Sequence, residues 1–117
     1  MAACRLRIVV YPELHRTWTA RALEHDFAAE ARSIELAVDA VVKFALAHIA
    51  HDLRHGREAL SAFAPAPARY WTAFEAGMPL PISMDVPWSK DGRVAHISTA
   101  VARRHPAARL PLAERTA

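Results

Sequence analysis

The chain has a single cysteine, Cys4, and only three glycines among its 117 residues. One cysteine excludes an internal disulfide and any zinc finger built on cysteine pairs. The glycines, Gly56, Gly77 and Gly92, lie far apart, which excludes a glycine-rich loop of the kind that holds nucleotide phosphates. The sequence contains no Gly-x-Ser-x-Gly, so it lacks the nucleophile elbow of serine hydrolases.

Long apolar runs are also missing. The longest nearly apolar stretch, residues 37–50, is interrupted by Asp39, Lys43 and His48, and it is shorter than the roughly 20 residues that a membrane-spanning helix needs. Near the N-terminus, an apolar run of about four residues ends at Pro12, unlike the layout of a signal peptide. We therefore expect a cytoplasmic protein without a membrane partner.

An excess of charge is absent from most of the chain. Residues 1–100 contain 11 Lys or Arg and 11 Asp or Glu, which cancel. The net charge of +3 therefore comes from residues 101–117, which hold four arginines and one glutamate. Arg103, Arg104 and Arg109 in this basic tail are the candidate nucleic-acid contacts. A solvated tail and docking on an acidic patch of a partner are the alternatives.

Short strands are predicted in the first third of the chain, at residues 5–11, 17–23 and 27–31. Apolar and polar residues alternate in each, which is the period of a strand with one buried face. Pro12 ends the first strand, because proline cannot donate to a strand ladder. The short connector before Thr17 predicts an antiparallel hairpin.

A long helix is predicted over Ser33–His55. Apolar residues recur there at three- and four-residue spacing from Ile34 to Leu53. The hydroxyl of Ser33 is a favourable N-cap, and Gly56 is a favourable residue just past the end. At ~1.5 Å per residue the helix is about 33 Å long, and we expect it to carry the core.

A second, short helix is predicted over residues 67–76, with a proline at its start and Gly77 just past its end. Tyr70, Trp71 and Phe74 form one aromatic face of this helix. We expect that face to pack on the sheet or on a partner subunit, and a ligand-stacking role is the alternative.

Residues 81–88 are predicted to form a fourth strand, because Ile82, Met84 and Val86 alternate with polar residues. Prolines near both ends indicate an edge position in the sheet. Residues 93–98 fit a fifth strand and the start of a helix equally well.

These elements predict the α+β class, an antiparallel sheet of three to five strands with one long helix packed on it, in the order β-β-β-α-(α)-β. We expect a single domain over residues 1–100. Its core lies in residues 5–56, and the aromatic helix and the further strand lie in residues 67–88. Residues 101–117 are the basic tail.

The stretch Trp18–Phe44, WTARALEHDFAAEARSIELAVDAVVKF, resembles the HicB-type antitoxin domain of bacterial toxin–antitoxin pairs. In that family a turn leads into a short strand, a small residue and a polar cap follow, and a Leu-Glu-Glu-Ala-type helix begins. The corresponding residues here are His25-Asp26-Phe27 at the turn, Ala31-Arg32-Ser33 at the cap and Ile34-Glu35-Leu36-Ala37 at the helix start. This sequence has His25-Asp26 where the family usually has Pro-Gly, and Ala31 where it usually has Gly.

The resemblance implies a partial ribonuclease-H-like fold. It also implies that the chain is a non-catalytic, HicB-like protein-binding module, and that it could be the antitoxin that blocks a small RNA-cleaving toxin. Two other functions stay open, a stand-alone homo-oligomer such as a dimer and a nucleic-acid-binding regulator that acts through the tail. The candidate partner-binding residues are Tyr70, Trp71, Phe74, Ile82, Met84, Val86, Thr17, Thr19 and Arg21.

Three histidines form the sharpest local pattern. His48, His51 and His55 are spaced by three and four residues, which places them on one side of the predicted helix. Imidazoles so spaced can share a zinc ion, so they are the candidate metal ligands. The alternative is that histidines near a helix C-terminus are favoured by the negative end of the helix dipole. No carboxylate cluster or nucleophile–base set is identifiable, so we expect no catalytic residues and no cofactor.

Overall fold

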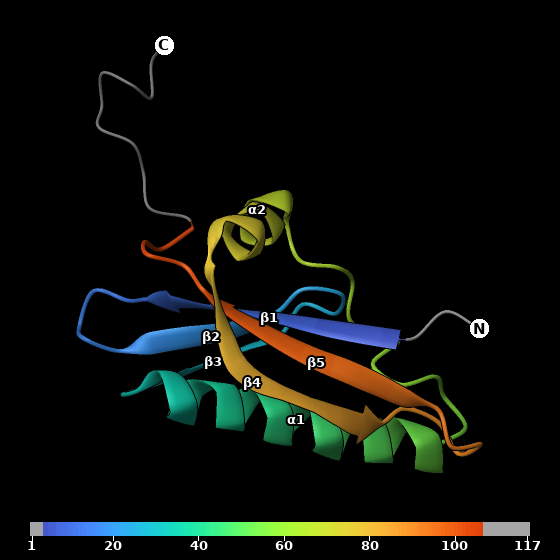
Figure 1. The fold of residues 1–117 in the computed structure, drawn as a ribbon. Helices are drawn as coiled ribbons and strands as arrows, with labels where there is room; N and C mark the ends of the chain where they lie inside the picture. The colour runs from blue at the N-terminus through green and yellow to red at the C-terminus, as the bar shows by residue number, and fades with distance from the viewer. Residues whose placement is uncertain (1–3, 107–117) are drawn as a thin grey trace.

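The computed structural model describes residues 4–106. The elements in chain order are β1 (Cys4–Pro12), β2 (Trp18–Ala22), β3 (Ala28–Ala31), α1 (Ile34–Arg54), α2 (Ala68–Ala76), β4 (Met78–Pro87) and β5 (Val94–Val101). The strands make one five-stranded sheet in the order β3-β2-β1-β5-β4. The two helices lie on opposite faces of this sheet, so the structure has three layers (Figure 1).

The α+β class and the single long helix are confirmed, but the sheet is mixed rather than wholly antiparallel. Neighbouring strands β1–β2, β2–β3 and β4–β5 are antiparallel, whereas β1 and β5 run parallel. Parallel neighbours need a long crossover. Here the connection runs through β2, β3, α1, α2 and β4, and β5 then inserts beside β1. The segment 93–98, for which strand and helix were both open, contributes to strand β5.

The main core lies between α1 and the sheet. Helix α1 begins after Ser33, whose Oγ accepts the N–H of Leu36 at 3.1 Å, and it ends before Gly56, whose φ is +70°. Its buried residues pack against the central strands. They are Ala37, Val38, Val41, Val42, Ala45 and Ile49, and they share a core with Leu6, Ile8, Val10 and Ile97. Each fully buried aliphatic side chain of this size contributes about 1.5–3 kcal/mol, so this layer holds the fold together.

Strand β1 is buried on both faces, because α2 covers the other side of the sheet. Val9 and Tyr11 lie there in a smaller core with Tyr70 of α2. The rings of Tyr11 and Tyr70 are 5.7 Å apart. The guanidinium of Arg21 lies 4.4 Å from the centre of the Tyr70 ring, and its Nε donates to the Tyr11 hydroxyl at 3.1 Å. The aromatic face of α2 therefore packs on the sheet.

The folded part continues past residue 100. Ala102 is buried, and its N–H donates to the carbonyl of Val10 at 2.8 Å. The ring of His105 lies 4.7 Å from that of Tyr11, and its Nε2 is 3.1 Å from a carboxylate oxygen of Glu13. Residues 101–105 thus pack with the domain, contrary to the expected tail boundary. Arg109 lies outside the described residues.

Candidate functional site

Three of the predicted partner-binding residues are inside the molecule. Tyr70, Thr19 and Val86 are 5%, 7% and 3% exposed. Tyr70 and Thr19 lie in the layer under and beside α2, and Val86 belongs to the core on the α1 side. The prediction that these three residues belong to a partner surface is wrong, because other layers of the same chain cover their side chains.

Two neighbouring predicted residues, Thr17 just before β2 and Arg21 within it, are engaged within the chain. The hydroxyl of Thr17 donates to a carboxylate oxygen of Glu30, and a guanidinium nitrogen of Arg21 donates to Asp26. Burial raises the pKa of the Tyr11 hydroxyl that Arg21 also contacts, although the Arg21 hydrogen bond and charge oppose that rise. Thr17 and Arg21 therefore stabilise the sheet and the turns beside it.

Trp71 and Phe74 are half-buried against the sheet. Ile82 and Met84 lie on the other face, where Met84 is 40% exposed and Ile82 packs against the main core. The structure therefore divides the predicted partner residues between two faces of the sheet. Only β4 presents them at a free edge.

Strand β4 is an edge strand, as its prolines predict. The N–H of Trp88 donates to the carbonyl of Arg93 at 2.8 Å, one step beyond the register pair Pro87/Val94. Hydrogen-bonded pairs alternate along an antiparallel ladder, so Ser83 and Asp85 direct their N–H and C=O groups away from β5. Pro87 has the same orientation and costs the ladder no donor. The free edge thus presents two N–H groups in a defined register.

Large apolar side chains are exposed on β4 and on α1. Met78, at the start of β4, is 70% exposed. Helix α1 carries the partly exposed side chains of Leu36, Phe44 and Leu46, and the Phe44 ring lies 4.9 Å from that of Phe27, the residue just before β3.

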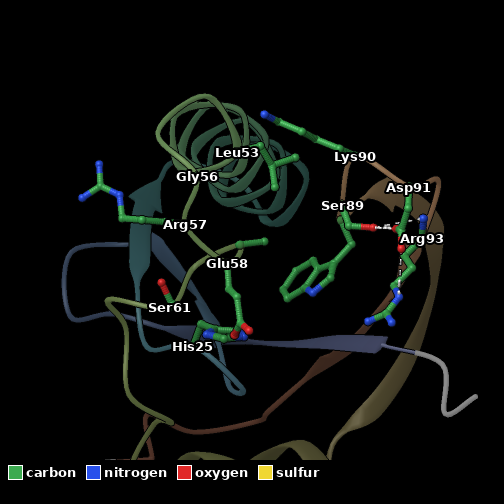
Figure 2. A pocket seen from close by; sticks show the side chains of 12 residues that line it. His25, Leu53, Gly56, Arg57, Glu58, Ser61, Ser89, Lys90, Asp91 and Arg93 are labelled. Carbon is green, nitrogen blue, oxygen red and sulfur yellow. Dashed lines mark hydrogen bonds and ion pairs between the residues drawn. The ribbon is translucent and has the colours of Figure 1, made fainter.

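The C-terminal end of β4 borders a hollow of about 660 Å³. It lies between the end of α1, the loop that follows it and the β4–β5 turn (Figure 2). Trp88 lines it, with its ring centre 5.5 Å from that of His25. In Figure 2 the side chains of Arg57 and Lys90 extend away from the hollow, whereas that of Glu58 extends toward His25. Its volume lies in the range of about 300–1,000 Å³ that is typical of ligand pockets.

A buried carboxylate shapes one wall of this hollow. Asp52 is 2% exposed, and its Oδ2 accepts the N–H of Leu60 at 2.9 Å. Its oxygens also lie 3.6 Å from Nε of Arg57 and 3.8 Å from Nδ1 of His48. Leu60 has a φ of +58°, a backbone conformation that residues other than glycine adopt only at a cost in free energy. Asp52 therefore fixes the loop after α1, a role that the sequence analysis missed. The sequence does contain a signal of this role, because Asp52 is an acidic residue three positions after Ile49 and so lies within the apolar stripe of the helix.

The three histidines do lie along one side of α1. The rings of His51 and His55 are 4.3 Å apart. Nδ1 of His55 contacts the carbonyl of His51 at 2.8 Å, and Nε2 of His51 is 3.3 Å from a guanidinium nitrogen of Arg57. Desolvation, and after it the positive charges of His55, Arg57 and Arg54, lower the pKa of His51. Within residues 4–106, no group of three or more His, Cys, Asp or Glu side chains is arranged to hold a metal ion.

No protein-family model, curated protein or solved structure matches this chain. The resemblance to HicB-type antitoxin domains thus rests on the Trp18–Phe44 pattern alone and stays a prediction. Among the described helices, none is both long and apolar enough to cross a membrane.

Proposed function

We propose that this chain is a non-catalytic, HicB-like protein-binding module that binds a small protein partner along the free edge of β4. In its antitoxin form, the partner is a small RNA-cleaving toxin whose active surface the module covers. We assign this function to the cytoplasm. The observation that carries the proposal is the unpaired edge at Ser83 and Asp85.

An edge strand with free N–H and C=O groups is a template for a strand from another chain. Backbone hydrogen bonds to Ser83 and Asp85 supply affinity, and Pro87 limits how far the pairing extends. Exposed Met84 and the hollow beside Trp88 supply side-chain specificity. A partner strand that runs along β4 reaches this hollow at the end of the pairing.

A second copy of the chain is the alternative partner, because the outward-facing residues of β4 can pair symmetrically with those of another β4. Antiparallel pairing about Met84 places Ser83 opposite Asp85 of the second copy, and Asp85 opposite Ser83 of that copy. Each opposed pair exchanges two hydrogen bonds. Such an arrangement is two-fold symmetric and makes one continuous sheet across both copies.

Ser83→Pro tests the proposal, because it removes an N–H that points outward and leaves the β4–β5 ladder intact. Ser83→Ala is the matched control, since it keeps the N–H and removes only the hydroxyl. The tagged proteins are purified from the native host, the retained proteins are identified by mass spectrometry, and the mass is measured by light scattering.

We expect wild type and Ser83→Ala to retain one stoichiometric small protein that Ser83→Pro loses, at an unchanged melting temperature. A doubled mass with no second polypeptide, lost in Ser83→Pro, establishes the homodimer instead. A wild-type monomer that retains nothing, or a Ser83→Pro variant that binds as wild type does, refutes binding at this edge.

A further inference from the structure

A second hollow, of about 550 Å³, lies on the α2 side of the sheet. One wall is the face of α2 that carries Arg69, Thr72, Ala73 and Ala76, spaced as neighbours on a helix surface. The opposite wall is the segment 102–106 after β5, which runs beside α2 (Figure 1). Two stretches that are more than 25 residues apart in the sequence thus form one open groove.

The charge of this groove has a single sign. Arg69, Arg103, Arg104 and His105 line it, and no Asp or Glu is among the described lining residues. Arg103 and Arg104 are exposed, and neither has a hydrogen bond or an ion pair to another residue of the described range 4–106. Convergent cations without a carboxylate between them concentrate positive potential in a hollow.

The positions of these arginines are set by the core beneath them. Ala102 is bonded to β1 through the Val10 carbonyl, and His105 is held between the Tyr11 ring and Glu13. Arg103 and Arg104 lie between these two anchors. Arg69 is held as well, because its guanidinium lies 4.7 Å from the centre of the Tyr70 ring and donates to the Tyr70 hydroxyl at 3.3 Å.

The carboxylate that contacts His105 has a second partner. Glu13 contacts His105 and also accepts the hydroxyl of Thr19 at 2.9 Å. Glu13 is committed to these two contacts, and the described lining residues include no carboxylate to pair with the three guanidiniums.

We propose that this groove binds phosphate groups, carried by a nucleotide or by a nucleic-acid strand. A guanidinium presents a planar fork of donors that fits two oxygens of one phosphate. Three of them match a multiply charged anion better than a single carboxylate. The alanines between them leave the groove open to a ligand.

The site differs from a contact made by the tail alone, because Arg69 of α2 belongs to it. It does not rest on the protein-binding proposal, since it lies on the other face of the sheet and uses none of the β4 residues.

The test compares two triple variants of the full chain. R69Q/R103Q/R104Q removes the groove charges. R5Q/R32Q/R54Q is the matched control, because it lowers the net charge by the same amount. The three arginines that it replaces are exposed and have no ion pair within residues 4–106. Binding of a fluorescein-labelled single-stranded DNA oligonucleotide is measured by anisotropy at low salt, and ATP and inorganic pyrophosphate are added as competitors. Melting temperatures confirm that both variants are folded.

We expect the groove variant to weaken binding by about tenfold or more, and the control to stay within about twofold of wild type. Competition by ATP at an affinity equal to that of the oligonucleotide identifies a nucleotide site. Affinity that grows with strand length, with a salt slope of about −2 that the groove variant loses, identifies a strand site.

Three results overturn the proposal. Wild type binds neither the oligonucleotide nor ATP nor pyrophosphate. The two triple variants weaken binding equally, which shows a diffuse effect of net charge. A poly-glutamate peptide displaces the oligonucleotide more strongly than pyrophosphate does, which shows an acidic-peptide site.

Discussion

Replacement of Asp52 by alanine is expected to destabilise the protein and to open the hollow beside Trp88. The carboxylate is buried at the end of α1 and accepts the N–H of Leu60 at 2.9 Å. Without it, that buried donor has no acceptor, which costs about 1–3 kcal/mol. The ion pair with Arg57 adds little, about 0–1 kcal/mol, because the arginine side chain is half exposed.

The expected loss for Asp52→Ala is therefore about 1–4 kcal/mol in the free energy of unfolding. For a domain of this size, that lowers the melting temperature by about 10 °C. Asp52→Asn keeps an oxygen that can accept the Leu60 N–H, so it should cost only about 1 kcal/mol.

Urea unfolding measures these free energies, and amide hydrogen exchange at Leu60 reports whether the loop has opened. Asp52→Ala should increase exchange at Leu60 well beyond the increase at amides in β1. The reasoning is refuted if Asp52→Ala costs less than about 1 kcal/mol, or if Asp52→Asn costs as much as Asp52→Ala.

Three further predictions follow from single features. Burial raises the pKa of Tyr11 above 10.0, so the folded state holds that proton more tightly than the unfolded state does. The free energy of unfolding should therefore fall as the pH rises through and above about 10. Urea titrations at several pH values should show a smaller fall for Tyr11→Phe. A Cβ at Gly77 would lie 2.7 Å from the backbone oxygen of Val101, so Gly77→Ala should lower the free energy of unfolding by about 1–3 kcal/mol. The control Ala76→Ser, at the neighbouring residue, should lower it by less than about 1 kcal/mol in the same assay. Saturating zinc should leave the melting temperature unchanged, because nitrogens of His51 and His55 already have partners within α1 and its following loop; a rise of more than about 5 °C would contradict this and establish the histidine site.

Local chemistry explains which elements could be predicted from the sequence. The limits of α1 follow from the hydroxyl of Ser33 and the left-handed conformation of Gly56, and both act within one turn of the helix. The edge position of β4 follows from proline, which cannot sit in the middle of a sheet.

Long-range pairing explains what could not be predicted. The alternation in Val94–Val101 is compatible with a strand, but nothing in it indicates a parallel partner at the other end of the chain. The burial of Thr19 depends on the layer that α2 adds to the second face of the sheet, and the burial of Val86 depends on where α1 crosses β4. Asp52 reads as a polar break in an apolar stripe until the loop that it holds is known.

The candidate sites divide in the same way. Arg103 and Arg104 stand out as a charged pair in the sequence, but Arg69 joins them only through the packing of α2 beside the segment after β5. The edge of β4 was predicted, whereas the identity of its two outward N–H groups depends on the register with β5.

The position of β1 has a consequence for how the protein is made. This strand leaves the ribosome first among the described elements, yet its parallel neighbour β5 is synthesised about ninety residues later. Until then β1 has one open side, and residues such as Val9 on its outer face still lack the cover of α2. A nascent or truncated chain that stops before Val94 therefore carries a strongly apolar strand with one open edge, which is the kind of segment that aggregates. The order of strands thus leaves one edge of β1 open until β5 has been synthesised.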